Sequence, residues 1–140
     1  MHAVCGDCYA QASVGMLEAR VRIATGNAEK PLFSVQDIID CTLRTYSYGC
    51  FGGLSYLTAG KYAQDFGFTT EQCYPYLGEQ GNCSTNTSPE CRRRTYTLKY
   101  EYIGGYYGAC NEELMMLELV QNGPFATSMK VDDKCFLILN

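Results

Sequence analysis

Apolar side chains recur at helical spacing in four parts of the chain, which predicts four helices. The helices are expected over residues 8–25, 34–41, 54–66 and 112–121. Gly26-Asn27 and Gly67 are typical stop signals after the first and third helices, and Asn111 is a suitable N-cap for the fourth. Ser34-Val35-Gln36-Asp37 resembles a capping box, with Asp in the place of Glu, and opens the second helix.

Turn and strand patterns replace the helical spacing elsewhere in the second half. Residues 73–91 are rich in Gly, Pro and Asn and contain three cysteines, so we expect disulfides to hold this segment. β-Branched and aromatic residues alternate from Thr95 to Tyr107 and predict a strand, and Phe125 to Val131 predicts the start of another. We expect Arg92-Arg93-Arg94 to be a solvated loop.

The composition favours one folded domain or a piece of a larger one. The chain has 140 residues, of which 46% are hydrophobic and 19% charged, unlike a disordered sequence. A net charge of −4 argues against nucleic acid as a partner, and no apolar run approaches the roughly 18 residues of a membrane helix. No secretory signal precedes the first cysteine. Nine cysteines nevertheless indicate an oxidising compartment, and their odd number leaves at least one without a partner in the chain.

The motif Cys5-Gly6-Asp7-Cys8 allows three interpretations. A redox Cys-x-x-Cys normally follows a strand, which the pattern here does not predict. Half of a zinc site would need a second cysteine pair or a histidine pair, and His2 is the only histidine of the chain. In the third interpretation Cys8 is a nucleophile in the first turn of a helix, where free N–H groups and the positive end of the helix dipole stabilise a thiolate.

The motif and several later segments resemble the papain-type cysteine peptidases (family C1). Cys5-Gly6-Asp7-Cys8-Tyr9 is close to the signature around the catalytic cysteine of that family. Five further segments are similar to the branch of the family that releases dipeptides: residues 15–20, 33–41, 59–67, 104–112 and 117–124. The resemblance implies an α+β, papain-like fold that is incomplete here. Residues 1–123 would form the mainly helical left domain, with disulfide-stapled loops, and residues 124–140 the start of the β-barrel right domain.

The resemblance also implies roles for individual residues. Cys8 falls on the nucleophile that forms a thioester with the substrate, and His2 falls on the oxyanion-hole position. Gly52 and Gly53 fall on the backbone segment that binds an extended substrate, where glycine permits a close approach. Disulfides are implied between Cys5 and Cys50, Cys41 and Cys83, and Cys73 and Cys91, which leaves Cys8, Cys110 and Cys135 free.

In the dipeptide-releasing branch a chloride ion lies at the bottom of the S2 pocket, and no metal is involved. By position, its ligands would be the backbone N–H groups of Leu54 and Tyr56 and the hydroxyl of Tyr102. Without the resemblance, Tyr102 is better explained as a core aromatic residue on a strand. Asn82 and Asn86 begin glycosylation sequons. The family and the cysteine content predict a lysosomal or extracellular location.

Three departures from the family pattern bear on activity. His2 stands where the family has an oxyanion-hole glutamine, and the loss of such a donor costs about 10²–10³ in rate. Asp7 replaces a small Ser or Ala, and a carboxylate beside the thiol opposes thiolate formation. No histidine follows His2, whereas the family's histidine base and asparagine lie about 130–150 residues after the cysteine. We therefore expect this chain to be a fragment that is inactive alone. A complementary chain would supply the catalytic histidine and asparagine, and an exclusion domain would complete the enzyme.

Three hypotheses follow for function. The favoured one is the nucleophile-bearing portion of a cysteine peptidase that acts on peptides or proteins and releases dipeptides. The alternative is a catalytically dead fragment or pseudoenzyme that binds peptides or peptidase partners, which the missing base, His2 and Asp7 support. A disulfide-rich structural protein would explain the cysteine count but not the family pattern around Cys8.

Overall fold

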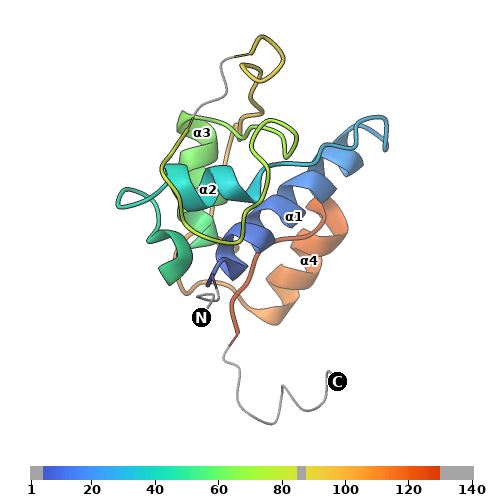
Figure 1. The fold of residues 1–140 in the computed structure, drawn as a ribbon. Helices are drawn as coiled ribbons and strands as arrows, with labels where there is room; N and C mark the ends of the chain where they lie inside the picture. Colours follow the sequence, from blue (N-terminus) through green and yellow to red (C-terminus); the bar gives the residue numbers. More distant parts are fainter. Residues whose placement is uncertain (1–4, 85–87, 130–140) are drawn as a thin grey trace, which may run out of the picture.

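One long helix, several shorter ones and long loops make up the computed structural model, which describes residues 5–84 and 88–129 (Figure 1). Its elements are α1 (Cys8–Ala24), α2 (Val35–Cys41), η1 (Gly49–Phe51), η2 (Tyr56–Tyr62), α3 (Ala63–Asp65) and α4 (Glu112–Asn122). The four predicted helices are confirmed. The third is formed by two elements, because η2 is π-helical and runs directly into α3.

The predicted helix signals are present in the structure. The Ser34 hydroxyl accepts a hydrogen bond from the Asp37 backbone N–H at 2.9 Å, and the Asn111 side chain accepts one from Leu114 at the same distance. Caps of this kind stabilise a helix by about 1 kcal/mol. Gly26 and Asn27 take left-handed φ angles of 58° and 68°, which ends α1.

The hydrophobic core lies where α1, α2 and the joined η2 and α3 meet. Ala10, Ile38 and Ala63 are completely buried at its centre. Ser13 of α1 and Thr58 of η2 are also completely buried, and their hydroxyl oxygens lie 2.9 Å apart in a hydrogen bond between the two elements. This bond satisfies two polar groups that would otherwise oppose the burial of the contact.

The two predicted strands are not formed in the described residues. From Thr95 the backbone makes isolated contacts in place of a continuous ladder. These are an antiparallel bridge with Phe68 and a 3.2 Å hydrogen bond from Thr97 N–H to the Ala63 carbonyl. Gly104 and Gly105 then turn the chain with φ angles of 88° and 91°. Residues 125–129 likewise form no strand. A strand needs a continuous partner, and these segments have none within the described part of the chain.

Side-chain packing accounts for the alternation that suggested a strand. An extended chain places residues i and i+2 on the same side even without a ladder of hydrogen bonds. Tyr100 and Tyr102 accordingly both contact Tyr56 of η2: the Tyr102 ring stacks on it with centroids 4.0 Å apart, and the Tyr100 ring meets it edge-on at 4.9 Å. The aromatic pattern therefore indicates packing on a helix.

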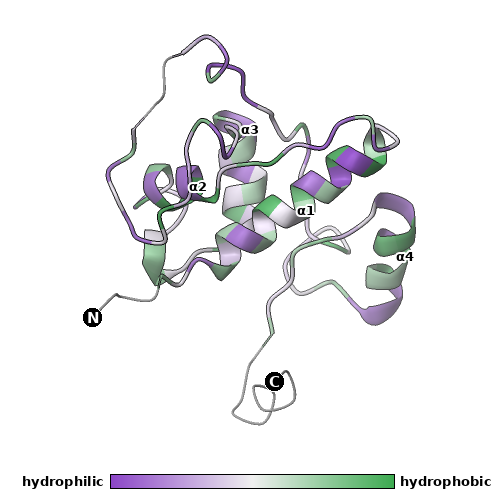
Figure 2. Ribbon diagram, turned by 45° about the vertical axis from the view of Figure 1, so that its right-hand side comes forward, coloured by the Kyte–Doolittle hydropathy of each residue, from purple (hydrophilic) through white to green (hydrophobic). Residues whose placement is uncertain are grey.

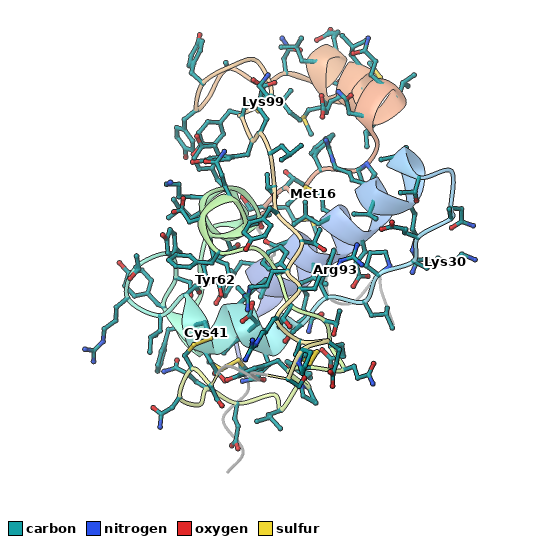
Figure 3. All side chains as sticks on the ribbon, turned by 90° about the horizontal axis from the view of Figure 1, so that it is seen from above. Met16, Lys30, Cys41, Tyr62, Arg93 and Lys99 are labelled. Carbon is teal, nitrogen blue, oxygen red and sulfur yellow. A yellow bond between two sulfur atoms is a disulfide. The ribbon has the colours of Figure 1, made fainter. Side chains whose placement is uncertain are left out.

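Three disulfides fasten the loops around the core. They join Cys5 to Cys50, Cys41 to Cys83, and Cys73 to Cys91, the same pairs that the family resemblance implies. Figure 3 shows the disulfide at Cys41, where the bridge ties the end of α2 to the loop that follows residue 73. Among the described residues, Cys8 and Cys110 are free and exposed. Cys135 lies outside the described residues.

Helix α4 is attached to the far half of α1 and is otherwise open. The Arg20 guanidinium forms a 2.7 Å ion pair with Glu118 and donates a 2.8 Å hydrogen bond to the Pro124 carbonyl. No residue of α4 is buried, and Figure 2 shows the helix standing apart from α2 and α3 with hydrophobic stretches along it. In the part of the chain that the structure describes, no helix is long and apolar enough to cross a membrane.

Arg94 corrects one expectation, because this member of the arginine run is not solvated. Its guanidinium lies 2.6 Å from the Asp37 carboxylate and donates a 2.9 Å hydrogen bond to the Gly67 carbonyl. The Asp37 side chain is 3% exposed and also accepts a hydrogen bond from the Tyr62 hydroxyl. Burial raises the pKa of Asp37 above its ordinary value, and the positive charge of Arg94 partly offsets this rise.

The buried pair predicts a stability defect that depends on pH. Arg94→Ala leaves the Asp37 carboxylate buried without its cation, so the free energy of unfolding should fall by about 3 kcal/mol at pH 7. Without Arg94 the pKa of Asp37 rises further, and the loss should shrink as the pH falls towards 4 and the carboxyl takes up a proton. Urea unfolding measured between pH 4 and pH 7 tests this.

Arg93→Ala is the matched control for this measurement, because Arg93 is exposed. Its effect should stay within about 0.5 kcal/mol at every pH. Equal effects of the two substitutions, or a loss at Arg94 that does not change with pH, would contradict the role assigned to the pair.

Candidate active site

Cys8 is the first residue of α1, and its side chain is exposed. The chain enters the helix through Asp7, whose carbonyl accepts hydrogen bonds from Ala10 and Gln11 at 2.8 and 3.0 Å. The first turn contains no acidic residue. The predicted position of the thiol, at the positive end of a helix dipole, is therefore the observed one.

The turn before Cys8 is fastened to a second segment, residues 47–53. The Cys5–Cys50 disulfide joins the two segments, and the Gly6 N–H donates a 2.9 Å hydrogen bond to the Cys50 carbonyl. A Cβ atom at Gly6 would lie 2.8 Å from that carbonyl oxygen, closer than side chains are found. Glycine is therefore required at this position so that the two segments can approach each other.

Tyr9 forms a second link to the same segment and was not identified from the sequence. Its ring is buried, and its hydroxyl lies 3.0 Å from both the Ser47 hydroxyl and the Gly49 carbonyl. Burial raises the pKa of Tyr9, although the hydrogen bond with Ser47 acts in the opposite direction. The phenol thus remains a hydrogen-bond donor at neutral pH, within one residue of the thiol.

Gly52 and Gly53, which the family resemblance assigns to substrate binding, lie in this segment. Gly52 has a φ angle of 114°, which favours glycine, and its carbonyl accepts a hydrogen bond from Tyr48 N–H. Gly53 pairs with Ser47 in an antiparallel bridge, and a Cβ atom there would lie 2.6 Å from the Tyr9 ring. Glycine at position 53 is therefore needed for internal packing against Tyr9.

The three residues proposed for chloride lie on two segments that meet. Tyr56 is the first residue of η2 and Leu54 lies two residues before it, and Tyr102 stacks on Tyr56 with the two rings 2° from parallel. Burial raises the pKa of the Tyr56 phenol, so it stays neutral. In the residues that the structure describes, no cluster of His, Cys, Asp and Glu side chains is suited to a metal ion.

A cavity of about 770 Å³ has the two stacked tyrosines, Tyr56 and Tyr102, in its wall. Residues of α1 and α4 also line it, among them Arg20 and Leu114 (Met16 and Lys99, which line it too, are labelled in Figure 3). Cys8, Gly52 and Gly53 are not part of its lining. The cavity and the Cys8 thiol are thus distinct features of the molecule.

Several predicted site residues lie outside the described part of the chain. These are His2, Cys135 and Asn86. Asn82 is exposed, and its backbone carbonyl accepts a 3.1 Å hydrogen bond from the Tyr74 hydroxyl. Since His2 is the only histidine in the sequence, no imidazole lies near Cys8 in the part of the chain that the structure describes.

Comparisons with known proteins define the class of this chain. The profile described as "Papain family cysteine protease" matches residues 1–139. The chain belongs to the papain family of cysteine proteases. Cathepsin C of Schistosoma mansoni is 49% identical over 129 residues, which cover 91% of this chain and 27% of that protein. Fruit bromelain of Ananas comosus is 35% identical over 123 residues, 87% of this chain and 31% of that protein.

Solved structures share the same fold. A cysteine protease of Carica candamarcensis, CMS1MS2, determined in complex with E-64, has a TM-score of 0.51 at 36% identity and matches 58% of this chain and 36% of that chain. The proform of the ragweed pollen allergen Amb a 11 has a TM-score of 0.54 at 34% identity, over 62% of this chain and 23% of that chain. The papain-like fold class is confirmed, and the chain spans about a third or less of the curated relatives named here.

The link through Tyr9 predicts a specific loss of stability. Tyr9→Phe keeps the buried ring but removes the hydroxyl that bonds to Ser47 and Gly49, so the free energy of unfolding should fall by about 1–2 kcal/mol. Tyr48→Phe is the matched control, because Tyr48 is 71% exposed. This substitution should change the free energy of unfolding by less than about 0.5 kcal/mol. Urea unfolding measures both, and a Tyr9→Phe variant as stable as the parent would contradict the role of the hydroxyl.

Proposed function

We propose that this chain is the nucleophile-bearing part of a cysteine peptidase of the dipeptidyl peptidase I (cathepsin C) type. The observation that carries the proposal is the position of Cys8, an exposed free thiol at the start of α1 that is fastened through Cys5–Cys50 to the segment with Gly52 and Gly53. Family membership and the identity to Cathepsin C of S. mansoni support the reaction class.

In the proposed reaction the Cys8 thiolate attacks the carbonyl carbon of a peptide that lies along Gly52 and Gly53. The start of α1 offers N–H groups and positive charge to the oxyanion that develops, and His2 is assigned to the same role by the family resemblance. The amine leaves with a proton from a histidine, and a thioester forms at Cys8. Water then cleaves the thioester, which releases the carboxylate product and the thiol.

The histidine that takes and returns the proton is proposed to come from outside this sequence. No histidine other than His2 is present, and the matched region covers 27% of Cathepsin C of S. mansoni. A complementary chain would supply the histidine and the asparagine, and an exclusion domain would limit the products to dipeptides. The division into a left domain over residues 1–123 and the start of a right domain over 124–140 belongs to the same proposal.

Chloride is the proposed ion of the substrate pocket. The backbone N–H groups of Leu54 and Tyr56 and the hydroxyl of Tyr102 would hold it, and the stacking of Tyr102 on Tyr56 supports this assignment because it brings the two segments together. Such an ion would shape the pocket for the side chain of the substrate without taking part in the chemistry.

The proposed location is the lysosome or the secretory pathway, where the three disulfides would persist. Glycans are proposed at Asn82 and Asn86. Peptide and protein substrates are the proposed partners, and the acidic charge of the chain argues against nucleic acid.

A second candidate function is a pseudoenzyme that binds peptides or peptidase partners. Asp7, a carboxylate next to Cys8 where the family has a small residue, favours this function together with the missing histidine. The two candidates differ in one property, the activation of the Cys8 thiol when the complement is present.

Labelling with an epoxide inhibitor that alkylates activated thiols separates the two. The chain should acquire the label at Cys8 only when a chain that carries the family's histidine and asparagine is added, because the thiol needs its base. Peptide mass spectrometry locates the label. The same mixture should release dipeptides from a peptide substrate.

Two controls sharpen the labelling experiment. Cys8→Ser should abolish the label, and Cys110, also exposed and free, should stay unlabelled in the same sample. Labelling of Cys110 and Cys8 alike would show general thiol reactivity without activation. If the two chains are shown to associate and Cys8 still acquires no label, the result would favour the pseudoenzyme.

A further inference from the structure

Asp7, the residue immediately before Cys8, is bound to a distant loop. Its carboxylate Oδ2 accepts a 2.8 Å hydrogen bond from the Tyr76 hydroxyl and a 3.0 Å hydrogen bond from the Gln11 side-chain amide. Asp7 occupies the N-cap position of α1, where an aspartate commonly accepts bonds from the backbone N–H groups of the first turn. Its side chain makes no such bond. The carboxylate is therefore bonded to two side chains and not to the backbone N–H groups at the helix end that carries the thiol.

The loop that carries Tyr76 is mounted on α2 by buried polar side chains. The Gln36 side chain is completely buried, and its carbonyl accepts a 2.9 Å hydrogen bond from the Leu77 N–H. Asp40, one turn later and 5% exposed, accepts a 2.7 Å hydrogen bond from the Gly81 N–H. These contacts hold the backbone on both sides of the loop tip. Tyr76 is 42% exposed, yet its backbone is adjacent to the anchored Leu77.

We infer that Tyr76 is a positioning residue that holds the Asp7 carboxylate away from the first turn of α1, so that the Cys8 thiolate forms at an uncapped helix end. Without the phenol, the carboxylate is free to cap the N–H groups of the first turn, and its negative charge then opposes the thiolate. The inference rests on the proposed role of Cys8 as a nucleophile. It explains how the chain accommodates a carboxylate at a position where the family has a small residue.

Two roles of Tyr76 must be separated by experiment. In a purely structural role, the hydrogen bond to Asp7 fastens the loop. Its loss would then affect Cys8 because the loop and the turn before α1 become less rigid. In the positioning role, the effect depends on the charge of Asp7 and vanishes when that charge is removed. The rate at which Cys8 is alkylated, compared between a neutral and an anionic reagent, distinguishes the two.

The experiment uses the oxidised 140-residue chain with Cys110→Ser and Cys135→Ser, which leaves Cys8 as the free thiol beside the three disulfides. Tyr76→Phe should slow alkylation by iodoacetamide about threefold at pH 7 and low salt. Alkylation by iodoacetate should slow by a larger factor, because the released carboxylate also repels the anionic reagent. Added salt should reduce the difference between the two reagents.

Asp7→Ser is the matched control, since it removes the carboxylate and restores a small residue. This variant should react at least as fast as the parent, and Tyr76→Phe added to it should change neither rate. Gln11→Ala, at an exposed position, removes the second donor to Asp7 and should slow the reaction in the same direction as Tyr76→Phe, by a smaller factor. Circular dichroism on each variant checks that the fold is kept.

Two outcomes would overturn the inference. One is that Tyr76→Phe slows the alkylation of Cys8 equally in the parent and in the Asp7→Ser variant, which would show a structural role. The other is an unchanged rate with both reagents in Tyr76→Phe and in Gln11→Ala. The measurement needs neither substrate nor a histidine, so its failure leaves the peptidase proposal standing, and failure of epoxide labelling leaves this result unaffected.

Discussion

The Cys5–Cys50 disulfide is the constraint on which the rest of the site depends. It brings the turn before α1 against residues 47–53, close enough for the 2.9 Å hydrogen bond from Gly6 to Cys50. The buried phenol of Tyr9 adds a second connection to the same segment. The exposed thiol of Cys8 and the backbone at Gly52, 44 residues further along the sequence, are thereby held in one arrangement.

Helix α2 has a comparable role for the loop that carries Tyr76. It is only seven residues long, too short to be stable alone, and most of its side chains are buried. Its polar residues Gln36 and Asp40 provide hydrogen bonds to loop backbone, while Asp37 pairs with Arg94. Buried polar groups usually oppose folding, but here each bonds a segment that has little hydrophobic packing of its own.

The helices, their caps and the neighbourhood of Cys8 were predictable from the sequence, because they depend on local signals such as Ser34, Asn111 and the cysteine motif. The strand predicted from Thr95 was wrong because alternation at Tyr100 and Tyr102 reports an extended backbone, and the partner that makes a strand is not a local property. The roles of Tyr9, Tyr76 and Arg94 were missed for a related reason. Each depends on a contact with a residue far away in sequence, and a single sequence contains no signal for such a contact.

The placement of the disulfides divides the described chain into two parts with different resistance to opening. All three bridges lie between Cys5 and Cys91, so the denatured state of this part is restricted by cross-links. From residue 92 to 129 the described chain has no disulfide, and α4 depends on the ion pair between Arg20 and Glu118 and on a few neighbouring contacts. Local opening of α4, none of whose residues is buried, therefore costs less free energy than opening of the cross-linked body and leaves that body intact. Helix α4 can thus rearrange against a partner while the turn with Cys8 stays in place.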